Sequence, residues 1–202
     1  MAIKAFRIAL MAFLFISLVS VSVQEPVKAQ SSAVLDAAIV QDLQLVVPNF
    51  GIVSAALLRG GQPNLSRLES LKRAGVKTIV DLRDGQHDID TERECAEKLG
   101  LKFVSIPLSV FKTVSKDKVE KFLSTVRNPE NQPVFVHCRQ GQDRCGTMVA
   151  MYRTLEQSWT IDKAYVEMLK YGFHPMFVGL SASVAAMQSM QQAKQKTATL
   201  VN

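Results

Sequence analysis

From about residue 50 onward, short apolar runs alternate with amphipathic segments. The runs are rich in β-branched residues and bounded by Gly, Pro or polar residues, as is typical of buried strands; they cover 52–58, 76–82, 101–106 and 133–136. The segment Gly60–Pro63 is typical of a turn. In the other segments apolar residues recur every three or four positions, as on one face of a helix; these segments are 64–75, 91–99, 115–126, 148–155, 161–169 and 176–193. We expect Asn64 to cap the first of these helices. The alternation predicts an α/β domain with a central, mostly parallel sheet of about four to five strands flanked by helices.

The first 29 residues have a different pattern. Lys4 and Arg7 precede an apolar stretch at 8–23, and small residues follow in the segment 27–29. This order is typical of a secretory signal peptide cleaved after residue 29. We therefore expect export to the periplasm or the medium, with no stable membrane insertion after cleavage. An uncleaved membrane anchor is the alternative, although the apolar stretch is shorter than the ~20 residues that a span needs.

The remaining chain is long enough for one domain with its own core. We expect a linker or N-terminal arm at 30–48, a single domain at 49–195, and a disordered tail at 196–202. The tail follows a Gln-rich stretch that we interpret as the frayed end of the last helix.

Composition limits the ligands. The 202-residue chain has 24 Lys and Arg against 18 Asp and Glu, a formal charge of +6, which favours anionic ligands. No run of basic residues interleaved with aromatics is present, so we expect no nucleic-acid partner. Its three cysteines and three histidines do not follow zinc-ligand spacing, so we expect neither a metal nor another cofactor. The sequence does not indicate an oligomeric state.

The strongest motif is HCRQGQDRCG, residues 137–146, placed between a predicted strand and a predicted helix. A loop at that position directs backbone N–H groups and the helix dipole toward an anion. Gly141 permits the backbone angles that such a turn requires. We therefore expect a phosphate site made of Arg139, Gln140, Gly141, Gln142, Asp143 and Arg144.

Within this loop, Cys138 and Arg144 form a chemical pair. A thiol at a helix N-terminus beside a guanidinium has its pKa lowered to roughly 3.5–7.5, so it is a nucleophilic thiolate at neutral pH. The planar guanidinium binds two phosphate oxygens at once. A structural cysteine with an unrelated surface arginine is the alternative.

The segment 137–146 resembles the HCxxGxxR signature of the protein-tyrosine and dual-specificity phosphatases. The upstream segments NFGIVSAALLRGGQPN, GVKTIVDLR and FVSIPL are similar to the small atypical dual-specificity phosphatases of bacteria, plants and fungi. The resemblance implies the phosphatase α/β fold, Cys138 as nucleophile and Arg144 as phosphate ligand. It also implies that His137 orients the loop and tunes the thiol; a buried core histidine is the alternative.

The chain departs from that family pattern in its general acid. The family places an Asp after the strand that precedes the signature, but residues 99–115 contain no Asp or Glu. Asp143 is our candidate, because myotubularin-type phosphatases similarly carry an Asp before the signature Arg. Alternatively, Asp143 hydrogen-bonds loop amides or pairs with a basic residue. Asp84, Asp88 and Asp90 are further candidates.

A second departure is Cys145, at a position where the family has Ser or Thr. A thiol is the weaker hydrogen-bond partner, so we expect slower breakdown of a cysteinyl-phosphate. Cys145 could also form a reversible disulfide with an oxidised Cys138, or be a small buried residue at the start of the helix.

Four other polar residues carry weaker expectations. We expect Asp81 to be structural, and Arg59 and Arg83 either to reach an anionic substrate or to form ion pairs. For His174 we expect packing or capping.

Together these features predict a phosphatase that hydrolyses phosphomonoesters through a cysteinyl-phosphate on Cys138. Phosphotyrosine or another phosphoprotein is the expected substrate, with a small phosphoester included in the class. Phosphoinositides or inositol phosphates are the alternative. A phosphate-binding pseudophosphatase and a thiol–disulfide redox protein are the other classes considered.

Overall fold

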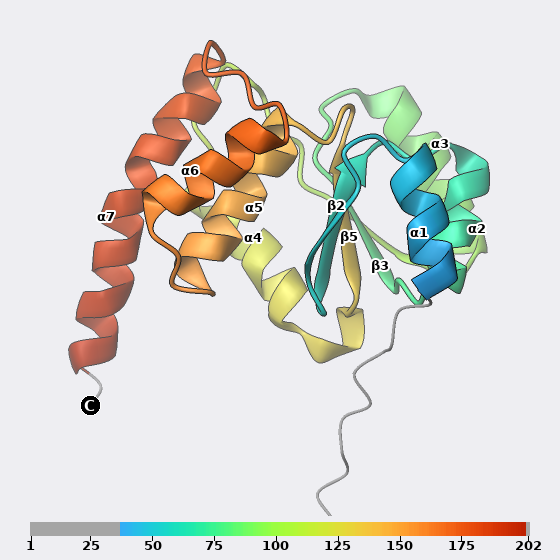
Figure 1. The fold of residues 1–202 in the computed structure, drawn as a ribbon, viewed down its shortest axis with the longest axis horizontal. Coiled ribbons are helices and arrows are strands. Elements are labelled where there is room, and N and C mark those ends of the chain that lie inside the picture. The colour runs from blue at the N-terminus through green and yellow to red at the C-terminus, as the bar shows by residue number, and fades with distance from the viewer. Residues whose placement is uncertain (1–36, 201–202) are drawn as a thin grey trace, which may run out of the picture. The chain divides into compact units, whose positions relative to one another are not determined.

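The computed structural model describes residues 37–200 (Figure 1). The expected signal peptide and residues 30–36 of the expected arm lie outside the described residues, as do residues 201–202. Within the described part, no helix combines the length and apolarity needed to cross a membrane.

A five-stranded sheet forms the centre of the domain. Its strands are β1 (Gly51–Ser54), β2 (Leu57–Gly61), β3 (Thr78–Asp81), β4 (Lys102–Ser105) and β5 (Val134–Cys138). They lie in the order β1-β2-β5-β3-β4. Only the hairpin β1–β2 is antiparallel, and the other pairs are parallel. The mostly parallel α/β sheet expected from the sequence is confirmed.

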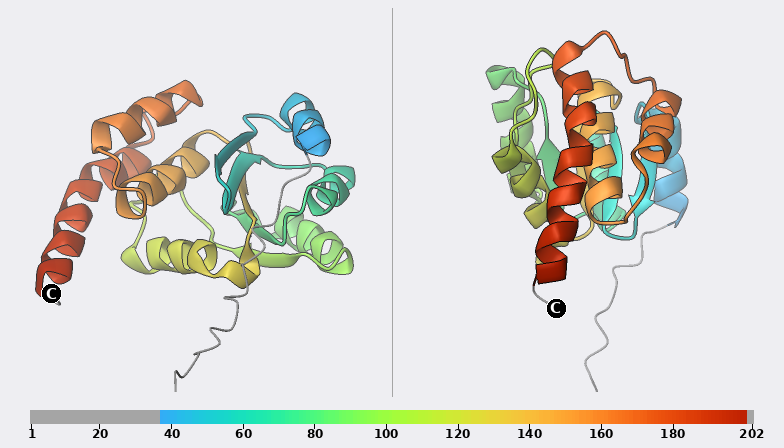
Figure 2. Two further views of the ribbon diagram at one scale, coloured as in Figure 1. Left: turned by 60° about the horizontal axis from the view of Figure 1, so that its bottom comes forward. Right: turned by 90° about the vertical axis from the view of Figure 1, so that its left-hand side faces the viewer.

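Helices cover both faces of this sheet (Figures 1 and 2). They are α1 (Ala37–Val46), α2 (Leu65–Arg73), α3 (Gln86–Lys98), α4 (Lys116–Arg127), α5 (Asp143–Leu155), α6 (Ile161–Lys170) and α7 (Val178–Leu200), with a short 3₁₀ helix at Pro129–Asn131. The first three helices lie on one side and the last four on the other. Helical connections between parallel strands place helices on both faces, so the strands are buried on both sides.

Strand β5 shows how the two faces are divided. Phe135 packs in the core beneath α1, α2 and α3. Its neighbours Val134 and Val136 pack in the core shared with α4 to α7, as does Cys138. Side chains alternate across a strand, so His137 lies on the face of Phe135 and its ring stacks on that residue at 5.8 Å.

Several predicted elements are confirmed with small boundary shifts. The predicted cap Asn64 accepts a hydrogen bond from the Arg67 backbone N–H at 3.0 Å, which satisfies one of the free N–H groups at the start of α2. In α4 the predicted apolar face is buried against the sheet; it consists of Val119, Phe122, Leu123 and Val126.

Two predictions about the region 52–61 were wrong. The single strand expected at 52–58 is a hairpin of β1 and β2 that turns at residues 55–56. Gly60 and Gly61, expected in a turn, are part of β2. A Cβ on Gly60 would lie 2.9 Å from Phe135, and one on Gly61 would lie 3.2 Å from the Gln140 backbone. These glycines therefore serve close packing of neighbouring segments.

The helix after the signature motif also begins earlier than predicted. We expected it from residue 148, but α5 starts at Asp143, so Arg144 and Cys145 belong to its first turn. An acidic residue favours a helix N-terminus because of the helix dipole. The loop between β5 and α5 is thus only four residues, 139–142.

Both ends of the described region are helical. Residues 37–46 form α1, whose Val40 and Leu43 are buried against α2 and β2, so this part of the expected linker or arm packs on the domain. Residues 196–200, expected in a disordered tail, continue α7 to Leu200. The stretch has no Gly or Pro and contains good helix formers.

Candidate active site

The signature loop, which we define as residues 138–144, lies where the parallel strands end. β5 finishes at Cys138, four residues follow, and α5 begins at Asp143. β5 lies between β2 and β3, so the loop is at the carboxyl edge of the sheet centre. This is the position at which α/β folds bind ligands.

Three contacts hold the loop from outside. The Asn49 side chain donates to the Gln140 carbonyl at 2.9 Å, and the Gln62 backbone N–H donates to the Arg139 carbonyl at 3.1 Å. Arg59 donates to the Gly141 carbonyl at 2.6 Å. These bonds engage the loop carbonyls and thereby help to leave the N–H groups facing inward.

Arg59 is a support for the loop rather than a residue facing the open site. It is 1 % exposed, and its guanidinium stacks on the Tyr171 ring at 3.8 Å. One of the two expected possibilities, contact with an anionic substrate, therefore does not fit its position. Its role in holding Gly141 could not be read from the sequence.

Gly141 is required by the conformation of the loop. Its φ is +73°, in the left-handed region, and a Cβ there would lie 2.5 Å from the backbone of both Gly60 and Gly61. Because β2 passes this close, only glycine fits.

Cys138 is 4 % exposed at the base of the loop. A hydrogen bond from the Cys145 side chain is the largest influence and lowers the pKa of Cys138 to about 5, against the opposing effect of burial. Backbone N–H groups of Cys145, Gly141 and Gln140 lower the pKa further. Cys138 is therefore a thiolate at neutral pH, as the motif predicts.

Cys145 is fully buried and has the opposite character. Burial raises the pKa of Cys145 well above its ordinary value, and the adjacent Cys138 raises it further. Its thiol also lies within hydrogen-bonding distance of the Gly60 and Val136 carbonyls, at 3.4 and 3.6 Å. Cys145 thus remains a protonated donor beside a thiolate, and neither cysteine forms a disulfide in the structure.

Arg144 lies at the rim of the site and forms an ion pair with Asp84. Its Nη2 donates to the Asp84 carboxylate at 2.9 Å, while its Nε is buried without a hydrogen-bond partner among the described residues. The Asp84 side chain is 51 % exposed. An anion that binds Arg144 would compete with this exposed, weakly held carboxylate.

His137 belongs to a buried ionic cluster on the other face of the sheet. Its Nε2 lies 2.8 Å from Glu92 and its Nδ1 3.9 Å from Asp81. Burial lowers the pKa of His137, but Glu92 and then Asp81 outweigh this effect, so the pKa is raised. The imidazole holds the end of β5 and points away from the Cys138 face. The tuning of the thiol that the resemblance implies for His137 comes instead from Cys145 and from the backbone N–H groups of Gly141 and Gln140.

The same cluster accounts for Asp81 and Arg83. Arg83 donates to Asp81 and to Glu92 at 2.7 Å each. Asp81 is structural, as expected, and Arg83 forms ion pairs rather than facing the open site. Asp81, Glu92 and His137 lie close enough together to hold a metal ion, but the Arg83 guanidinium already neutralises the carboxylates. Glu92, in α3, has no sequence signal that links it to the motif.

Asp143 faces His174, for which the sequence predicts packing or capping. Its Oδ1 accepts a hydrogen bond from the His174 backbone N–H at 2.7 Å. The His174 Nδ1 lies 3.1 Å from Oδ1 and 3.3 Å from Oδ2. The structure therefore joins Asp143 to the connection between α6 and α7. Of the other candidate acids, Asp90 forms an ion pair with Arg93 at 3.9 Å, and the side chain of Asp88 lies outside the described residues.

These groups meet in a pocket of about 430 Å³. Its base comes from the signature loop: Cys138, Arg139, Gln140, Gln142, Asp143 and Arg144. Its wall consists of Val110, His174, Met176 and Phe177. Every expected phosphate-site residue except Gly141 lines the pocket, and the Gly141 N–H bonds the Cys138 sulfur.

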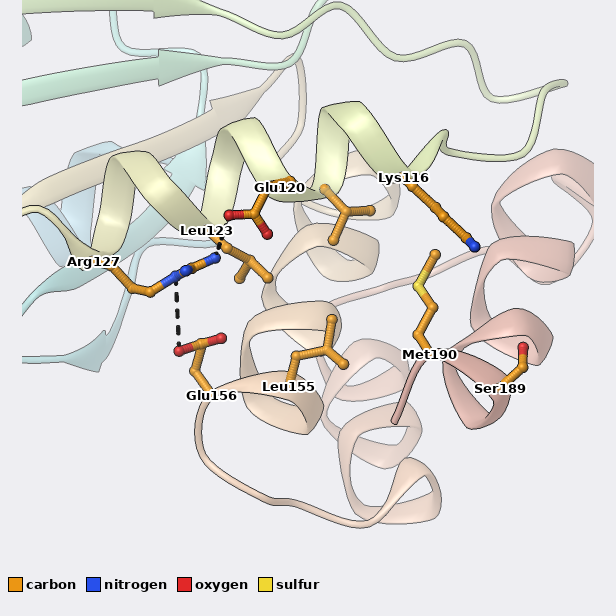
Figure 3. A pocket seen from close by; sticks show the side chains of 9 residues that line it. Lys116, Glu120, Leu123, Arg127, Leu155, Glu156, Ser189 and Met190 are labelled. Atoms are coloured by element: carbon orange, nitrogen blue, oxygen red, sulfur yellow. Dashed lines mark hydrogen bonds and ion pairs between the residues drawn. The ribbon is translucent and has the colours of Figure 1, made fainter. Parts of the chain in front are cut away.

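A second pocket of about 490 Å³ lies between α4, α5 and α7 (Figure 3). Its walls are mixed, with Leu123, Leu155 and Met190 beside charged residues. Arg127 spans it by pairing with Glu120 at 2.7 Å and with Glu156 at 4.0 Å. No residue of the signature loop lines this pocket.

Known proteins are similar to this chain in both sequence and fold. Dual specificity protein phosphatase TpbA of Pseudomonas aeruginosa is 31 % identical over 133 residues, which are 64 % of this chain and 58 % of TpbA. Inositol diphosphatase SIW14 of Saccharomyces cerevisiae is 28 % identical over 134 residues, 63 % of this chain and 47 % of the relative. The chain thus spans about half to three fifths of the length of these relatives.

Solved structures agree. A crystal structure of P. aeruginosa TpbA in complex with pTyr has a TM-score of 0.61 at 25 % identity, covering 82 % of this chain and 98 % of that one. The family model described as "DSP-PTPase phosphatase fused to NAD+ Kinase" matches residues 50–199. That match includes all five strands of the sheet and the entire signature loop. This chain therefore belongs to the DSP-PTPase phosphatase family.

Proposed function

We propose that this protein is a phosphatase that hydrolyses phosphomonoesters through a cysteinyl-phosphate on Cys138, with phosphotyrosine or another phosphoprotein as substrate. The observation that carries the proposal is the geometry around Cys138, which lines the pocket with Arg144 and accepts hydrogen bonds from the Cys145 thiol and from backbone N–H groups of the loop. These bonds lower the pKa of Cys138 to about 5. A buried thiolate is costly to maintain. Nucleophilic attack is a function that uses it.

The geometry supports a two-step reaction. The Cys138 sulfur attacks phosphorus and forms the S–P bond while the bond to the ester oxygen breaks. The loop N–H groups and Arg144 bind the equatorial oxygens, on which negative charge is distributed in the transition state. Water then attacks phosphorus, the S–P bond breaks, and the thiolate is regenerated with inorganic phosphate. The leaving oxygen takes up a proton in the first step, and the attacking water gives one up in the second. Asp143 and its contact His174 are the residues of the pocket placed to carry that proton.

The pocket walls favour an aromatic phosphoester. Beside the polar base, Val110, Met176 and Phe177 offer an apolar wall for a phenyl ring. TpbA is named a dual specificity protein phosphatase and has been crystallised with pTyr. Inositol phosphates are the second candidate, because SIW14 and plant relatives are named inositol diphosphatases. The basic side chains that line the pocket are Arg139, Arg144 and His174, without a Lys, which suits a polyanion less well.

A substrate panel tests the proposal. We expect the purified protein, under reducing conditions, to release phosphate from a phosphotyrosine peptide faster than from inositol polyphosphates or pyrophosphates. Cys138→Ser should abolish turnover while retaining binding of the phosphotyrosine peptide. A faster inositol substrate would support the second candidate. Binding of phosphate analogues without turnover of any substrate would identify a pseudophosphatase, and full activity of Cys138→Ser would exclude the mechanism.

We also propose that the protein is exported. The basic residues, apolar stretch and small residues within 1–29 support this proposal. Cell fractionation with N-terminal sequencing of the recovered protein is the test. An exported chain beginning at Gln30 is expected, whereas an uncleaved chain in the membrane fraction would indicate the anchor, and recovery from the cytoplasm would contradict export.

A further inference from the structure

The pair Asp143–His174 lies in the wall of the pocket that contains Cys138 and Arg144. Asp143 is in the first turn of α5, and His174 is in the connection of residues 171–177 between α6 and α7. The two residues are 31 positions apart in the chain and share three contacts of 2.7 to 3.3 Å. The carboxylate thus contacts both the backbone and the ring of His174.

Two features fix the position of the Asp143 carboxylate. The His174 backbone N–H donates to Oδ1, and a hydrogen bond to a carboxylate stabilises its charge. The N-terminus of α5 adds the positive end of the helix dipole. Both features hold the Asp143 carboxylate in place, with its oxygens against the Nδ1 side of the His174 ring.

The imidazole is placed to donate a proton into the pocket. With Nδ1 against Asp143, Nε2 is on the opposite side of the ring and makes no hydrogen bond to any described residue. The His174 side chain is 51 % exposed and lines the pocket. Phe177 packs against the ring edge to face, with centroids 5.8 Å apart, which limits its rotation. The other charged or titratable groups lining this pocket are Cys138, Arg139 and Arg144.

We propose that His174 is the proton donor to the leaving oxygen and that Asp143 is the carboxylate that orients it. The proposal rests on the phosphatase function proposed above. As the Cys138 S–P bond forms and the P–O bond breaks, the leaving oxygen takes the Nε2 proton and the imidazole becomes neutral. In the second step the attacking water gives a proton to Nε2, the S–P bond breaks, and the imidazolium is restored.

This assignment explains the departure from the family pattern. The segment 99–115 supplies Val110 to the pocket wall but contains no Asp or Glu that could act as acid. In this chain the proton donor therefore comes from the connection between α6 and α7, which also lines the pocket. Gly172, with φ +79°, lies within the same connection.

Leaving-group dependence tests the proposal. A general acid contributes about 10²–10⁴-fold, chiefly for poor leaving groups. We expect His174→Ala to lower kcat/KM for phenyl phosphate by about 10²-fold, and by much less for an aryl phosphate with a strongly acidic phenol. Asp143→Asn should show the same dependence on the leaving group. The double variant should lose little more kcat/KM than either single variant. Added imidazole should partly restore phenyl phosphate turnover by His174→Ala, a rescue that a merely structural role does not predict.

The controls separate the possible failures. Lys170→Gln, at an exposed position of α6, should behave as wild type, and circular dichroism should show that each variant is folded. If Asp143→Asn depends on the leaving group but His174→Ala does not, Asp143 is the acid and the proposal is overturned. Equal losses on all substrates, without rescue by imidazole, also overturn it. If the wild-type protein hydrolyses no phosphomonoester, the proposed function itself fails, and the role of His174 fails with it.

Discussion

Replacement of Cys145 by alanine is the sharpest test of how this site holds a thiolate. The Cys145 side chain is the largest influence that lowers the pKa of Cys138 from 9.0 to about 5. At pH 7, a thiol with a pKa of about 5 is about 99 % ionised, and one at 9.0 is only about 1 % ionised. The difference of about four units corresponds to about 5 kcal/mol at ~1.36 kcal/mol per unit.

The expected size of the change follows from that hydrogen bond. A hydrogen bond to a charged group contributes about 1.5–3 kcal/mol, equivalent to about one to two pKa units. Because Cys145→Ala removes the donor but leaves the backbone N–H groups, we expect the pKa of Cys138 to rise from about 5 to roughly 6–7. Cys145→Ser keeps a donor and supplies a stronger one, so its pKa should stay at or below that of the wild type.

The assay is the rate of Cys138 carboxamidomethylation by iodoacetamide between pH 4 and 9. Peptide mass spectrometry distinguishes Cys138 from the partly exposed Cys95. A wild-type midpoint near 9 would show that the thiolate is not stabilised. Identical midpoints for wild type and Cys145→Ala would show that Cys145 is not the cause, and would refute the reasoning about this pair.

Three further predictions concern the groups that support the site. Glu92→Gln removes a carboxylate from buried Arg83 and His137 and should lower the free energy of unfolding by about 3–5 kcal/mol in urea titrations; a loss below ~1 kcal/mol would contradict the buried cluster. Gly141→Ala should cost at least about 1–3 kcal/mol in backbone strain and abolish turnover, whereas Gly85→Ala, with nothing within 4 Å, should retain activity; an active Gly141→Ala would disprove the tight contact with β2. The pKa of His137 is raised in the folded state, so its contribution to stability is complete below pH 6.5 and is lost as the pH rises through the folded pKa. The difference in unfolding free energy between wild type and His137→Gln should therefore shrink as the pH rises. A difference that grows with pH would contradict the raised pKa.

Local patterns were sufficient for most of the fold. The apolar runs ending near residue 82 and residue 136 became β3 and β5, and the spacing in α4 matched its buried face. Predictions were wrong where a distant segment decided the outcome. Gly60 and Gly61 have the local signal of a turn, yet they continue β2 because β5 pairs with them and the Gln140 backbone lies close by.

The sequence by itself determined the motif: a strand, a Cys, an Arg six positions later and a helix, all within one short segment whose chemistry depends on local backbone geometry. It also identified Cys145 and Asp143 as the unusual members. Only the tertiary structure decided their partners. Glu92 beneath His137, Arg59 on the Gly141 carbonyl and His174 on Asp143 come from separate elements. Such contacts depend on how helices and connections pack across the sheet, and hydrophobic periodicity specifies which face is buried but not which polar groups meet there.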